Sequence, residues 1–219
     1  MIRPSVIIFD FDGVILESVS VKTEAFRQLF SFSPEHVDEI VLYHLDNGGM
    51  SRFEKFRHIF KNILHQEISR KRFDDLSQQF SDLVEDKVAN APFVVGALEF
   101  LQTQHATYSL YIVSATPEDE LRRIVHSRNI SQYFQGVFGS PVKKIDHIQR
   151  ILTDNKLLSL DVIFVGDAIN DEEAAKTAGV RFIGRENPGA QKRFNDIQGI
   201  EYIIEDIRDL SKYLSGPDL

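Results

Sequence analysis

The 219-residue sequence contains no cysteine. This absence excludes disulfide bonds, thiolate zinc sites and cysteine nucleophiles, and it fits a reducing compartment. No apolar run approaches the roughly 18 residues that a membrane-spanning helix needs. Asp10 and Asp12 interrupt the first apolar block too early for a signal peptide. We therefore expect a cytoplasmic protein that does not enter a membrane.

An excess of positive charge is also missing. The chain has 25 basic and 33 acidic residues and a net charge of -8, which disfavours a general affinity for nucleic acid or an anionic membrane surface. We also find no internal repeat, low-complexity tract or proline-rich and glycine-rich linker. Any anionic ligand must therefore be held by a local group of residues, and no nucleic-acid partner is expected. A monomer and a homodimer are both compatible with the sequence.

Short apolar blocks rich in β-branched residues predict strands that are covered on both faces. These blocks lie at Val6–Phe9, 110–113, 162–165, 182–183 and Tyr202–Ile204. Helical periodicity follows most of them, at 94–103, 118–128, 146–155 and 171–178. Strands that alternate with helices predict an α/β fold with a doubly wound parallel sheet.

One region departs from this alternation, because residues 19–88 show only helical patterning. We interpret it as an all-helical insertion into the α/β fold. The expected division is a core domain of residues 1–17 and 89–219 with an inserted helical cap domain of residues 18–88.

The insertion contains an amphipathic and basic stretch. Four apolar residues at spacings of three and four predict one apolar helix face: Phe53, Phe56, Phe60 and Ile63. Residues 49–73 carry seven basic and two acidic side chains, so their net charge is +5. We expect most of these charges to lie on a solvated helix face.

Two carboxylates, Asp10 and Asp12, follow the first predicted strand in the stretch FDFDGV. Ligands of a parallel α/β sheet bind beyond the carboxyl ends of its strands. Side chains two residues apart in extended backbone point the same way, so the two carboxylates can converge, and their repulsion then favours a bound cation. The pair predicts Mg²⁺, which prefers a few hard oxygen ligands. The alternative for a lone D-x-D motif is an aspartate-rich turn.

Later strand ends supply further carboxylates. Asp167 follows the predicted strand at 162–165, and Asp171 lies at the start of the next helix. Gly179 would end that helix. If the strands are neighbours, these two carboxylates add to the predicted metal site.

Groups that can bind an anion follow the other strands. Ser114 lies at the tip of the strand at 110–113, and Thr116 is expected to cap the next helix, with Pro117 at its first position. A hydroxyl and free backbone N–H groups form an anion-binding site. Lys144, just before a later helix, is a cation able to neutralise a transferring phosphoryl group.

In chain order, D-F-D-G-V, Ser114, Lys144 and G-D-x-x-N-D resemble the four motifs of the haloacid dehalogenase superfamily of phosphohydrolases. The insertion resembles the small cap of phosphoglycolate phosphatase and β-phosphoglucomutase relatives, so the resemblance covers essentially the whole chain. It implies a Rossmann-like core and a Mg²⁺-dependent phosphatase. The implied substrate is a small phosphorylated metabolite, such as phosphoglycolate or a sugar phosphate.

The resemblance implies roles for the four carboxylates. Asp10 would be the nucleophile that forms an aspartyl-phosphate. Asp12 would protonate the leaving oxygen and then activate the water that cleaves the intermediate. Asp10, the backbone carbonyl of Asp12 and Asp167 would hold Mg²⁺, with Asp171 assisting directly or through water.

The resemblance also implies how the phosphoryl group is held. Ser114 and the Ala115 amide would bind its oxygens, and Lys144 would neutralise charge on the nucleophile and the phosphate. Lys143 competes for this last role. Lys144 is preferred because Ile151 and Leu152 then follow at a spacing compatible with a helix, as in relatives.

The cap offers two candidate substrate-binding residues. The stretch GGMSRFEKF resembles a loop of β-phosphoglucomutase relatives whose arginine grips a phosphate, which makes Arg52 a candidate clamp. Lys22, just past the hinge, is a second candidate. The alternative for each is an ordinary surface charge. Many relatives have aspartate in place of Glu17, so the hinge geometry is open.

Two other functions stay in view. A phosphomutase shares every core motif and the arginine-bearing cap loop, and only cap closure decides whether water or a sugar hydroxyl receives the phosphoryl group. A non-catalytic binding relative would have lost a catalytic position, and none is lost here. Dehalogenation needs no acid at the position of Asp12, so that residue favours phosphoryl transfer.

Overall fold

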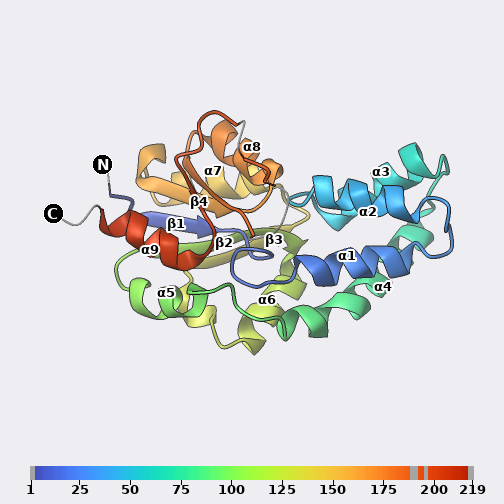
Figure 1. Ribbon diagram of the computed structural model, residues 1–219, viewed down its shortest axis with the longest axis horizontal. Helices are drawn as coiled ribbons and strands as arrows, with labels where there is room; N and C mark the ends of the chain where they lie inside the picture. The colour runs from blue at the N-terminus through green and yellow to red at the C-terminus, as the bar shows by residue number, and fades with distance from the viewer. Residues whose placement is uncertain (1–2, 188–191, 195–196, 217–219) are drawn as a thin grey trace.

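A computed structural model describes residues 3–187, 192–194 and 197–216. Within this part of the chain, parallel strands form one sheet in the order β3-β2-β1-β4-β5-β6 (Figure 1). The strands are β1 (Val6–Phe9), β2 (Ser109–Pro117), β3 (Gly136–Ser140), β4 (Val162–Gly166), β5 (Arg181–Arg185) and β6 (Tyr202–Ile204). From the central strand β1 the chain adds β2 and β3 on one side of the sheet, and then β4, β5 and β6 on the other. The predicted doubly wound α/β fold is therefore confirmed.

Strand β1 lies at the centre of the sheet and is buried on both faces. Val6 pairs with Ser109 of β2 and with Val162 of β4. Ile7 and Phe9 belong to one hydrophobic cluster, whereas Val6 and Ile8 belong to a second cluster on the opposite face. This alternation explains the continuous apolar run, because both faces of a parallel strand need apolar side chains.

Helices cover both faces of the sheet. Figure 1 shows α5 (Ala97–Gln104), α6 (Glu118–Ser127) and α9 (Ile207–Ser215) on one face, and α7 (Lys144–Asp154) and α8 (Ile169–Ala178) on the other. Short 3₁₀ turns lie at Ser131–Tyr133 and Ser159–Asp161. The predicted helices at 146–155 and 171–178 each begin two residues earlier than expected. Their first turns carry polar residues, which hide the apolar periodicity.

Two elements were missed and one was longer than predicted. Strand β3 has the sequence GVFGS, whose two glycines break the apolar pattern. Helix α9 was not predicted, although its apolar residues pack against α5. Strand β2 continues past Val113 to Pro117 through an irregularity in its pairing with β3.

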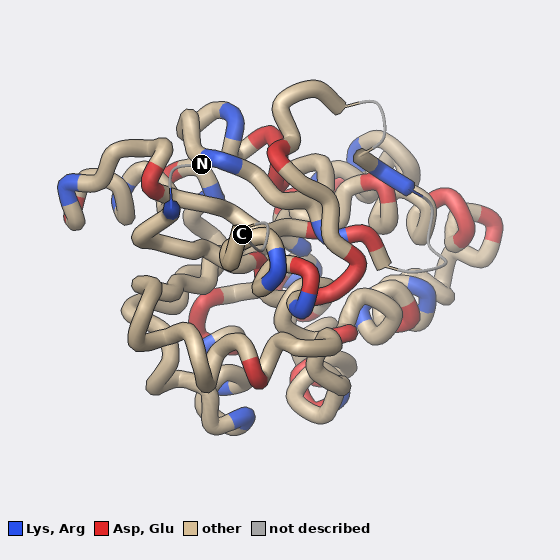
Figure 2. The backbone as a smooth tube through the Cα atoms, turned by 60° about the vertical axis from the view of Figure 1, so that its left-hand side comes forward, with Lys and Arg blue, Asp and Glu red and all other residues tan. Residues whose placement is uncertain are grey.

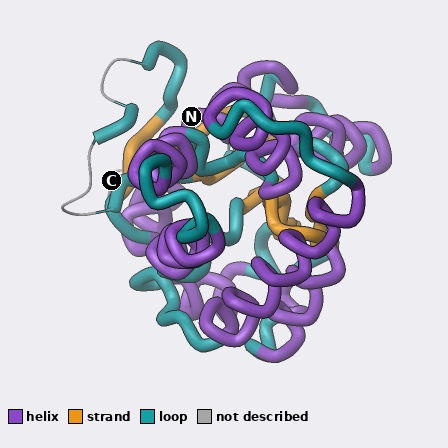
Figure 3. Tube along the Cα trace, turned by 90° about the vertical axis from the view of Figure 1, so that its right-hand side faces the viewer, coloured by secondary structure: helices purple, strands orange, loops and turns teal. Residues whose placement is uncertain are grey.

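The insertion is helical, as expected. It consists of α1 (Val19–Leu29), α2 (Val37–Asp46), α3 (Arg52–His58), a π-helical turn (Ile59–Ile63) and α4 (Arg70–Ala89). Figure 3, viewed from this end of the molecule, shows these helices in front of the strands. Aromatic rings fill their interior, since Phe26 lies 4.9 Å from Phe80 and 5.8 Å from Phe56 between ring centroids. The domain boundaries remain a prediction.

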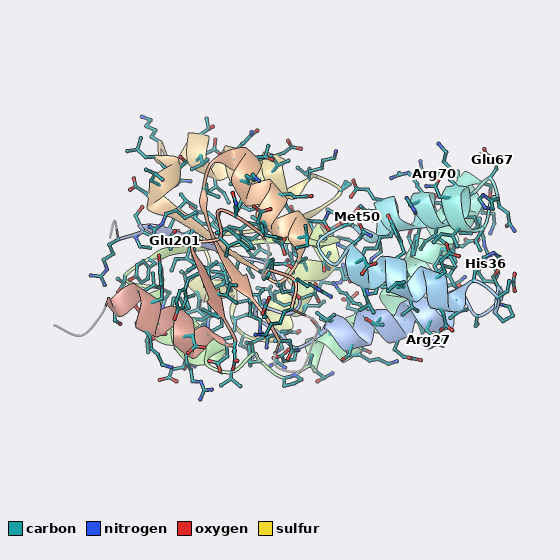
Figure 4. The ribbon with its side chains drawn as sticks, turned by 45° about the horizontal axis from the view of Figure 1, so that its top comes forward. Arg27, His36, Met50, Glu67, Arg70 and Glu201 are labelled. Atoms are coloured by element: carbon teal, nitrogen blue, oxygen red, sulfur yellow. The ribbon has the colours of Figure 1, made fainter. Side chains whose placement is uncertain are left out.

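The basic stretch of the insertion is only partly solvated. Five of its seven basic residues are exposed, but Arg52 and Lys55 are buried. Of the predicted apolar face, Phe56, Phe60 and Ile63 are buried, as expected, whereas Phe53 is only half-buried. Ile59, in the π-helical turn, is buried as well. In Figure 4, Met50 lies where the insertion meets the core, whereas His36, Glu67 and Arg70 lie at its far end. Most of the basic charges in this stretch are therefore solvated, as expected, and Arg52 and Lys55 are the two exceptions.

Acidic and basic positions are interspersed along the backbone in Figure 2 rather than separated by sign. Among the residues described, no helix combines the length and apolarity needed to cross a membrane. The charges that matter most for chemistry are the buried ones, which gather at one end of the sheet.

Candidate active site

Three carboxylates meet at the carboxyl ends of β1 and β4. Asp10 and Asp167 follow these adjacent strands, and Asp171 lies in the first turn of α8. One oxygen atom of each carboxylate lies within 4.8 Å of the corresponding oxygens of the other two. The strand order reverses here, which is where ligands bind in doubly wound sheets. The predicted convergence of Asp10, Asp167 and Asp171 is therefore present in the structure.

Two glycines make room for the cluster. A Cβ atom on Gly166 would lie 2.4 Å from the Cβ atom of Asp171. Gly13 has a φ angle of +76°, and a Cβ atom there would lie 2.3 Å from Oδ2 of Asp167. A side chain at either position would displace a carboxylate, and the left-handed backbone at Gly13 also favours glycine.

Lys144 lies inside the carboxylate cluster. Its Nζ atom is 3.0 Å from Oδ1 of Asp10 and 2.5 Å from Oδ1 of Asp171. Burial opposes the charged form, but Asp10 and Asp171 together raise the pKa of Lys144 above its ordinary value. Lys143 is exposed and precedes α7. Of the two lysines, Lys144 is thus the one in contact with the carboxylates.

The cluster holds more negative charge than Lys144 offsets. Burial raises the pKa of Asp10 to about 6, although Lys144 opposes the shift. Burial, followed by repulsion from Asp10 and Asp171, raises the pKa of Asp167 to about 8. Both shifts report that the ionised carboxylates are destabilised where they are. A cation in their midst would remove that destabilisation.

The donor set fits a divalent metal ion. Hard carboxylate oxygens are the ligands that such ions prefer. Oδ1 of Asp10 makes no hydrogen bond with any described residue, although Lys144 contacts it as an ion pair. The side chain of Asp12 does not belong to the cluster of Asp10, Asp167 and Asp171. The metal contact expected from its backbone carbonyl oxygen remains a prediction.

Asp12 faces a different set of partners. Ser18 donates to its Oδ1 at 2.6 Å, Thr116 donates to its Oδ2 at 2.9 Å, and Lys22 forms an ion pair with the same Oδ2. Burial alone would raise the pKa of Asp12, but Lys22 and these hydrogen bonds hold it below its ordinary value. Asp12 is therefore ionised, the form that a general base requires.

Thr116 does not cap α6, which corrects the expectation from sequence. Pro117 occupies the N-cap position, and the helix begins at Glu118. The Thr116 hydroxyl instead connects Asp12 and Lys22, since it accepts from Lys22 Nζ at 2.7 Å. The irregular end of β2 turns this side chain inward. Ser114, also buried there, accepts a 3.3 Å hydrogen bond from the Thr116 amide.

Arg52 bridges the insertion and the core. Its guanidinium group donates to Glu120 of α6 at 2.6 Å and to Ser81 of α4 at 2.8 Å, and it lies 4.4 Å from the centroid of the Phe80 ring. Both charged side chains of the ion pair are almost fully buried. Arg52 is thus not a surface charge, and in this conformation a carboxylate already neutralises it.

The candidate residues line one pocket between the insertion and the core. The pocket encloses about 620 Å³ of free space, including its opening to solvent. It is lined by Asp10, Asp12, Lys22, Arg52, Ser114, Ala115 and Asp167. Lys144 contacts Asp10 and Asp171, so both residues adjoin the pocket through Asp10. Every residue predicted for the site therefore lines this pocket or belongs to the cluster of Asp10, Asp167, Asp171 and Lys144 at its base.

Several residues at the pocket or in contact with its lining were not predicted as site residues. They are Ser18, His44, Lys55, Thr116 and Arg193. Arg193 donates to the carbonyl oxygens of Asp167 and Leu45, at 3.2 and 3.3 Å, and so links the core to α2. Ser18 stands six residues after Asp12, a separation at which only a closed loop brings side chains together. No periodicity or motif in the sequence marks these residues.

The sequence pattern of haloacid dehalogenase-like hydrolases matches residues 7–185. A phosphoglycolate phosphatase from Pseudomonas putida is 26% identical over 228 aligned positions, which cover 98% of this chain and 81% of that protein. The match includes both the core and the insertion.

Solved structures share the fold. A predicted phosphoglycolate phosphatase from Haemophilus somnus superposes with a TM-score of 0.76 at 19% identity, covering 97% of this chain and 99% of that one. A haloacid dehalogenase-type hydrolase from Bacillus subtilis, crystallised with magnesium and described as showing interdomain movement, gives 0.71 at 18% identity, covering 97% and 99%. At these identities the likeness concerns the fold, including the helical insertion.

Proposed function

The chain belongs to the haloacid dehalogenase-like hydrolase family, and we propose that it is a Mg²⁺-dependent phosphatase that hydrolyses a small phosphorylated metabolite. The observation that carries this proposal is the cluster of Asp10, Asp171 and Lys144, which are buried, with the partly buried Asp167, beside the separately paired Asp12. The relative named phosphoglycolate phosphatase supports the substrate class.

In the first step, a carboxylate oxygen of Asp10 attacks phosphorus, and the bond from phosphorus to the alcohol oxygen breaks. A proton from Asp12 goes to the leaving oxygen. Asp12 is ionised while Lys22 pairs with it, so this step requires a proton on Asp12 once substrate is bound. An anionic substrate that draws Lys22 away would raise the pKa of Asp12 and favour that proton.

In the second step, Asp12 accepts a proton from water, and the resulting hydroxide attacks the phosphorus of the aspartyl-phosphate. The bond between phosphorus and the Asp10 oxygen breaks, which releases inorganic phosphate and restores the carboxylate. Ser18 and Thr116 orient Asp12 for both transfers through their hydrogen bonds.

The remaining residues bind the phosphoryl group and neutralise its negative charge. Ser114 and the Ala115 amide hold phosphoryl oxygens, and Lys144 offsets charge on Asp10 and on the phosphoryl group. Asp10, Asp167 and Asp171, with the Asp12 carbonyl, would hold Mg²⁺, which supplies positive charge against the negative charge of the cluster and the phosphate when bound. Lys22 lines the pocket and would bind the substrate.

Phosphate release from 4-nitrophenyl phosphate by the purified chain tests the proposal. We expect turnover that needs added Mg²⁺ and that EDTA abolishes, because the carboxylate cluster is destabilised without a cation. Turnover that survives thorough chelation would contradict the metal assignment. Hexose 1-phosphates in the same assay distinguish hydrolysis from mutase activity, since a mutase yields an isomerised sugar phosphate.

A further inference from the structure

A buried arginine at the end of β5 holds the loop that follows Asp12. Arg185 is the last residue of β5 and is only 3% exposed. Its Nη1 atom donates to the carbonyl oxygen of Gly13 at 2.9 Å, and its Nε atom donates to the carbonyl oxygen of Glu205 at 2.9 Å. It also forms a forked ion pair with Glu17, with 2.5 Å between Nη2 and Oε1 and 3.1 Å between Nη1 and Oε2. One side chain thus holds both ends of the loop from Gly13 to Glu17.

This attachment spans a neighbouring strand. Strand β4 lies between β1 and β5 in the sheet, so the loop that follows β1 must cross the carboxyl end of β4 to reach Arg185. Asp167 follows β4, and a Cβ atom on Gly13 would lie 2.3 Å from its Oδ2 atom. The loop therefore lies directly on the carboxylate cluster, and Arg185 holds it there from the far side.

The loop also controls the surroundings of Asp12. Asp12 directly precedes Gly13, and Ser18 directly follows Glu17, so each is joined by one peptide bond to a residue that Arg185 holds. Ser18 in turn donates to Oδ1 of Asp12 at 2.6 Å. Arg185 does not line the pocket itself. Any influence of Arg185 on Asp12 must therefore pass through the loop.

The same strand carries a second arginine–glutamate pair at its other end. Arg181 is the first residue of β5 and donates to both carboxylate oxygens of Glu201 at 2.6 Å. The pocket lies at the carboxyl ends of the strands, whereas this pair lies at the amino end of β5. The two pairs are alike in chemistry, and only that of Arg185 holds the loop beside Asp12.

We infer that Arg185 is a positioning residue for the proposed reaction, because it holds the loop from Gly13 to Glu17 and so keeps Asp12 where it transfers protons. A misplacement of about 1 Å can cost about 10²-fold in rate although the reacting group is intact. The second step depends most on this placement, since Asp12 must take a proton from water beside the aspartyl-phosphate. The inference rests on the proposed function, which supplies both that intermediate and the role of Asp12.

Rapid acid quenching with labelled 4-nitrophenyl phosphate measures formation and decay of the aspartyl-phosphate separately. Arg185→Lys keeps the charge but loses the fork. Decay should slow by about 10-fold or more, whereas formation should change by less than about 2-fold, because this leaving group needs little acid. Once decay limits turnover, kcat and KM should fall together and leave kcat/KM nearly unchanged. The matched control is Arg181→Lys, which should change neither rate constant.

Chemical rescue tests the same contact in another way. Arg185→Ala leaves Glu17 without its partner, but the Glu17 side chain is 29% exposed and can be hydrated, so this variant should fold. Millimolar guanidinium chloride should restore part of the decay rate of the aspartyl-phosphate, because the free ion has the same planar fork. Sodium chloride at the same concentration should not. A residue that only stabilises the fold would lower Tm and leave the ratio of the two rate constants unchanged.

The outcomes separate this inference from the proposed function. Equal slowing of formation and decay in Arg185→Lys, unchanged rate constants, or the same loss in Arg181→Lys would overturn the role of Arg185 while the phosphatase stands. A wild-type chain that releases no phosphate from any ester would instead overturn the proposed function, and the role of Arg185 with it. If both Arg185 variants prove unfolded by circular dichroism, Glu17→Gln decides through the same two rate constants, with Glu201→Gln as its control.

Discussion

The two sides of the pocket hold opposite charges in opposite ways. On the core side, Asp10, Asp167 and Asp171 crowd together around one lysine, and burial leaves them with excess negative charge. On the side of the insertion, Arg52 is neutralised by Glu120. Lys55 is buried without a carboxylate partner among residues 3–187, 192–194 and 197–216, and burial lowers the pKa of its side chain well below the ordinary value. Each side therefore has an unpaired charge. The carboxylates of the core side would be stabilised by a cation, and the lysine of the insertion would be stabilised by an anion.

The difference separates chemistry from recognition. The negative cluster suits a metal ion and phosphoryl transfer, whose requirements are the same for every phosphomonoester. We propose that the positive groups of the insertion meet the part of the substrate that varies. The experiments below test whether these two sides can be changed independently.

The largest effect should come from the core side. Asp10→Asn should reduce kcat on every phosphate ester by at least about 10⁴-fold, because an amide cannot form the aspartyl-phosphate and loss of a nucleophile is typically of this size. Its fold, measured by circular dichroism, should be unchanged. Asp154→Asn, which alters an exposed ion pair with Arg150, is the matched control and should retain full activity. Wild-type turnover by Asp10→Asn would exclude the proposed mechanism.

The next effect concerns the ion pair that joins the two sides. Glu120→Gln leaves the Arg52 guanidinium buried without its carboxylate, and removal of one partner of such a pair destabilises a protein by about 3–5 kcal/mol. Urea unfolding should show a loss of that order. The exposed Arg150–Asp154 pair again provides the control, since Asp154→Asn should cost less than about 1 kcal/mol. A negligible loss in Glu120→Gln would mean that Arg52 is available to the substrate, as the sequence prediction holds.

The core side was largely predictable from sequence, and the reason is topological. Asp10 and Asp167 each end an apolar strand, and parallel strands bring their carboxyl ends to one edge whatever lies between them. Lys144 was also found, although Lys143 competed, because helical periodicity favoured it. The short strand β3 was missed because two of its five residues are glycine.

The side of the insertion was not predictable in the same way. Lys55 lies among five exposed basic residues of the same stretch, and nothing local distinguishes it from them. Its burial depends on where α3 packs against α1 and α2, which no motif specifies. The same holds for Thr116, whose sequence context favours a helix cap, whereas the irregular end of β2 directs it to Asp12. Long-range packing overrides local preference at both positions.

A smaller effect distinguishes the two chemical steps on the core side. Asp12→Ala should slow hydrolysis of alkyl phosphates by about 10²-fold or more, because both general acid and general base are lost. With 4-nitrophenyl phosphate the leaving group needs little acid, so the aspartyl-phosphate should accumulate. Labelled phosphate trapped on the protein by acid quenching measures it. Slow turnover without any trapped label would argue against Asp12 as the base.

The smallest expected effect is a pH dependence of metal stabilisation. Asp10 and Asp167 have folded-state pKa values of about 6 and about 8, above their ordinary value of 3.8. A raised carboxylate pKa means that the folded state binds more protons than the unfolded state, so metal-free stability from these groups is greatest near pH 4 and falls as pH rises through 6 and 8. Mg²⁺ competes with those protons for the same oxygens. Its stabilisation should therefore be larger at pH 8 than at pH 5.5, by about 1–2 kcal/mol, or a few degrees in Tm for a chain of this size.

Thermal unfolding with and without MgCl₂ at the two pH values measures this difference. Asp167→Asn is the informative variant, because it removes the carboxylate with the higher pKa and should abolish most of the Mg²⁺ effect while raising metal-free stability at pH 8. Asp154→Asn should behave like the wild type. If Mg²⁺ stabilises the protein equally at both pH values, the ion binds away from these carboxylates, and the negative charge of the core side must be offset by Lys144 alone. The contrast between a side that needs a cation and a side that needs an anion would then be lost.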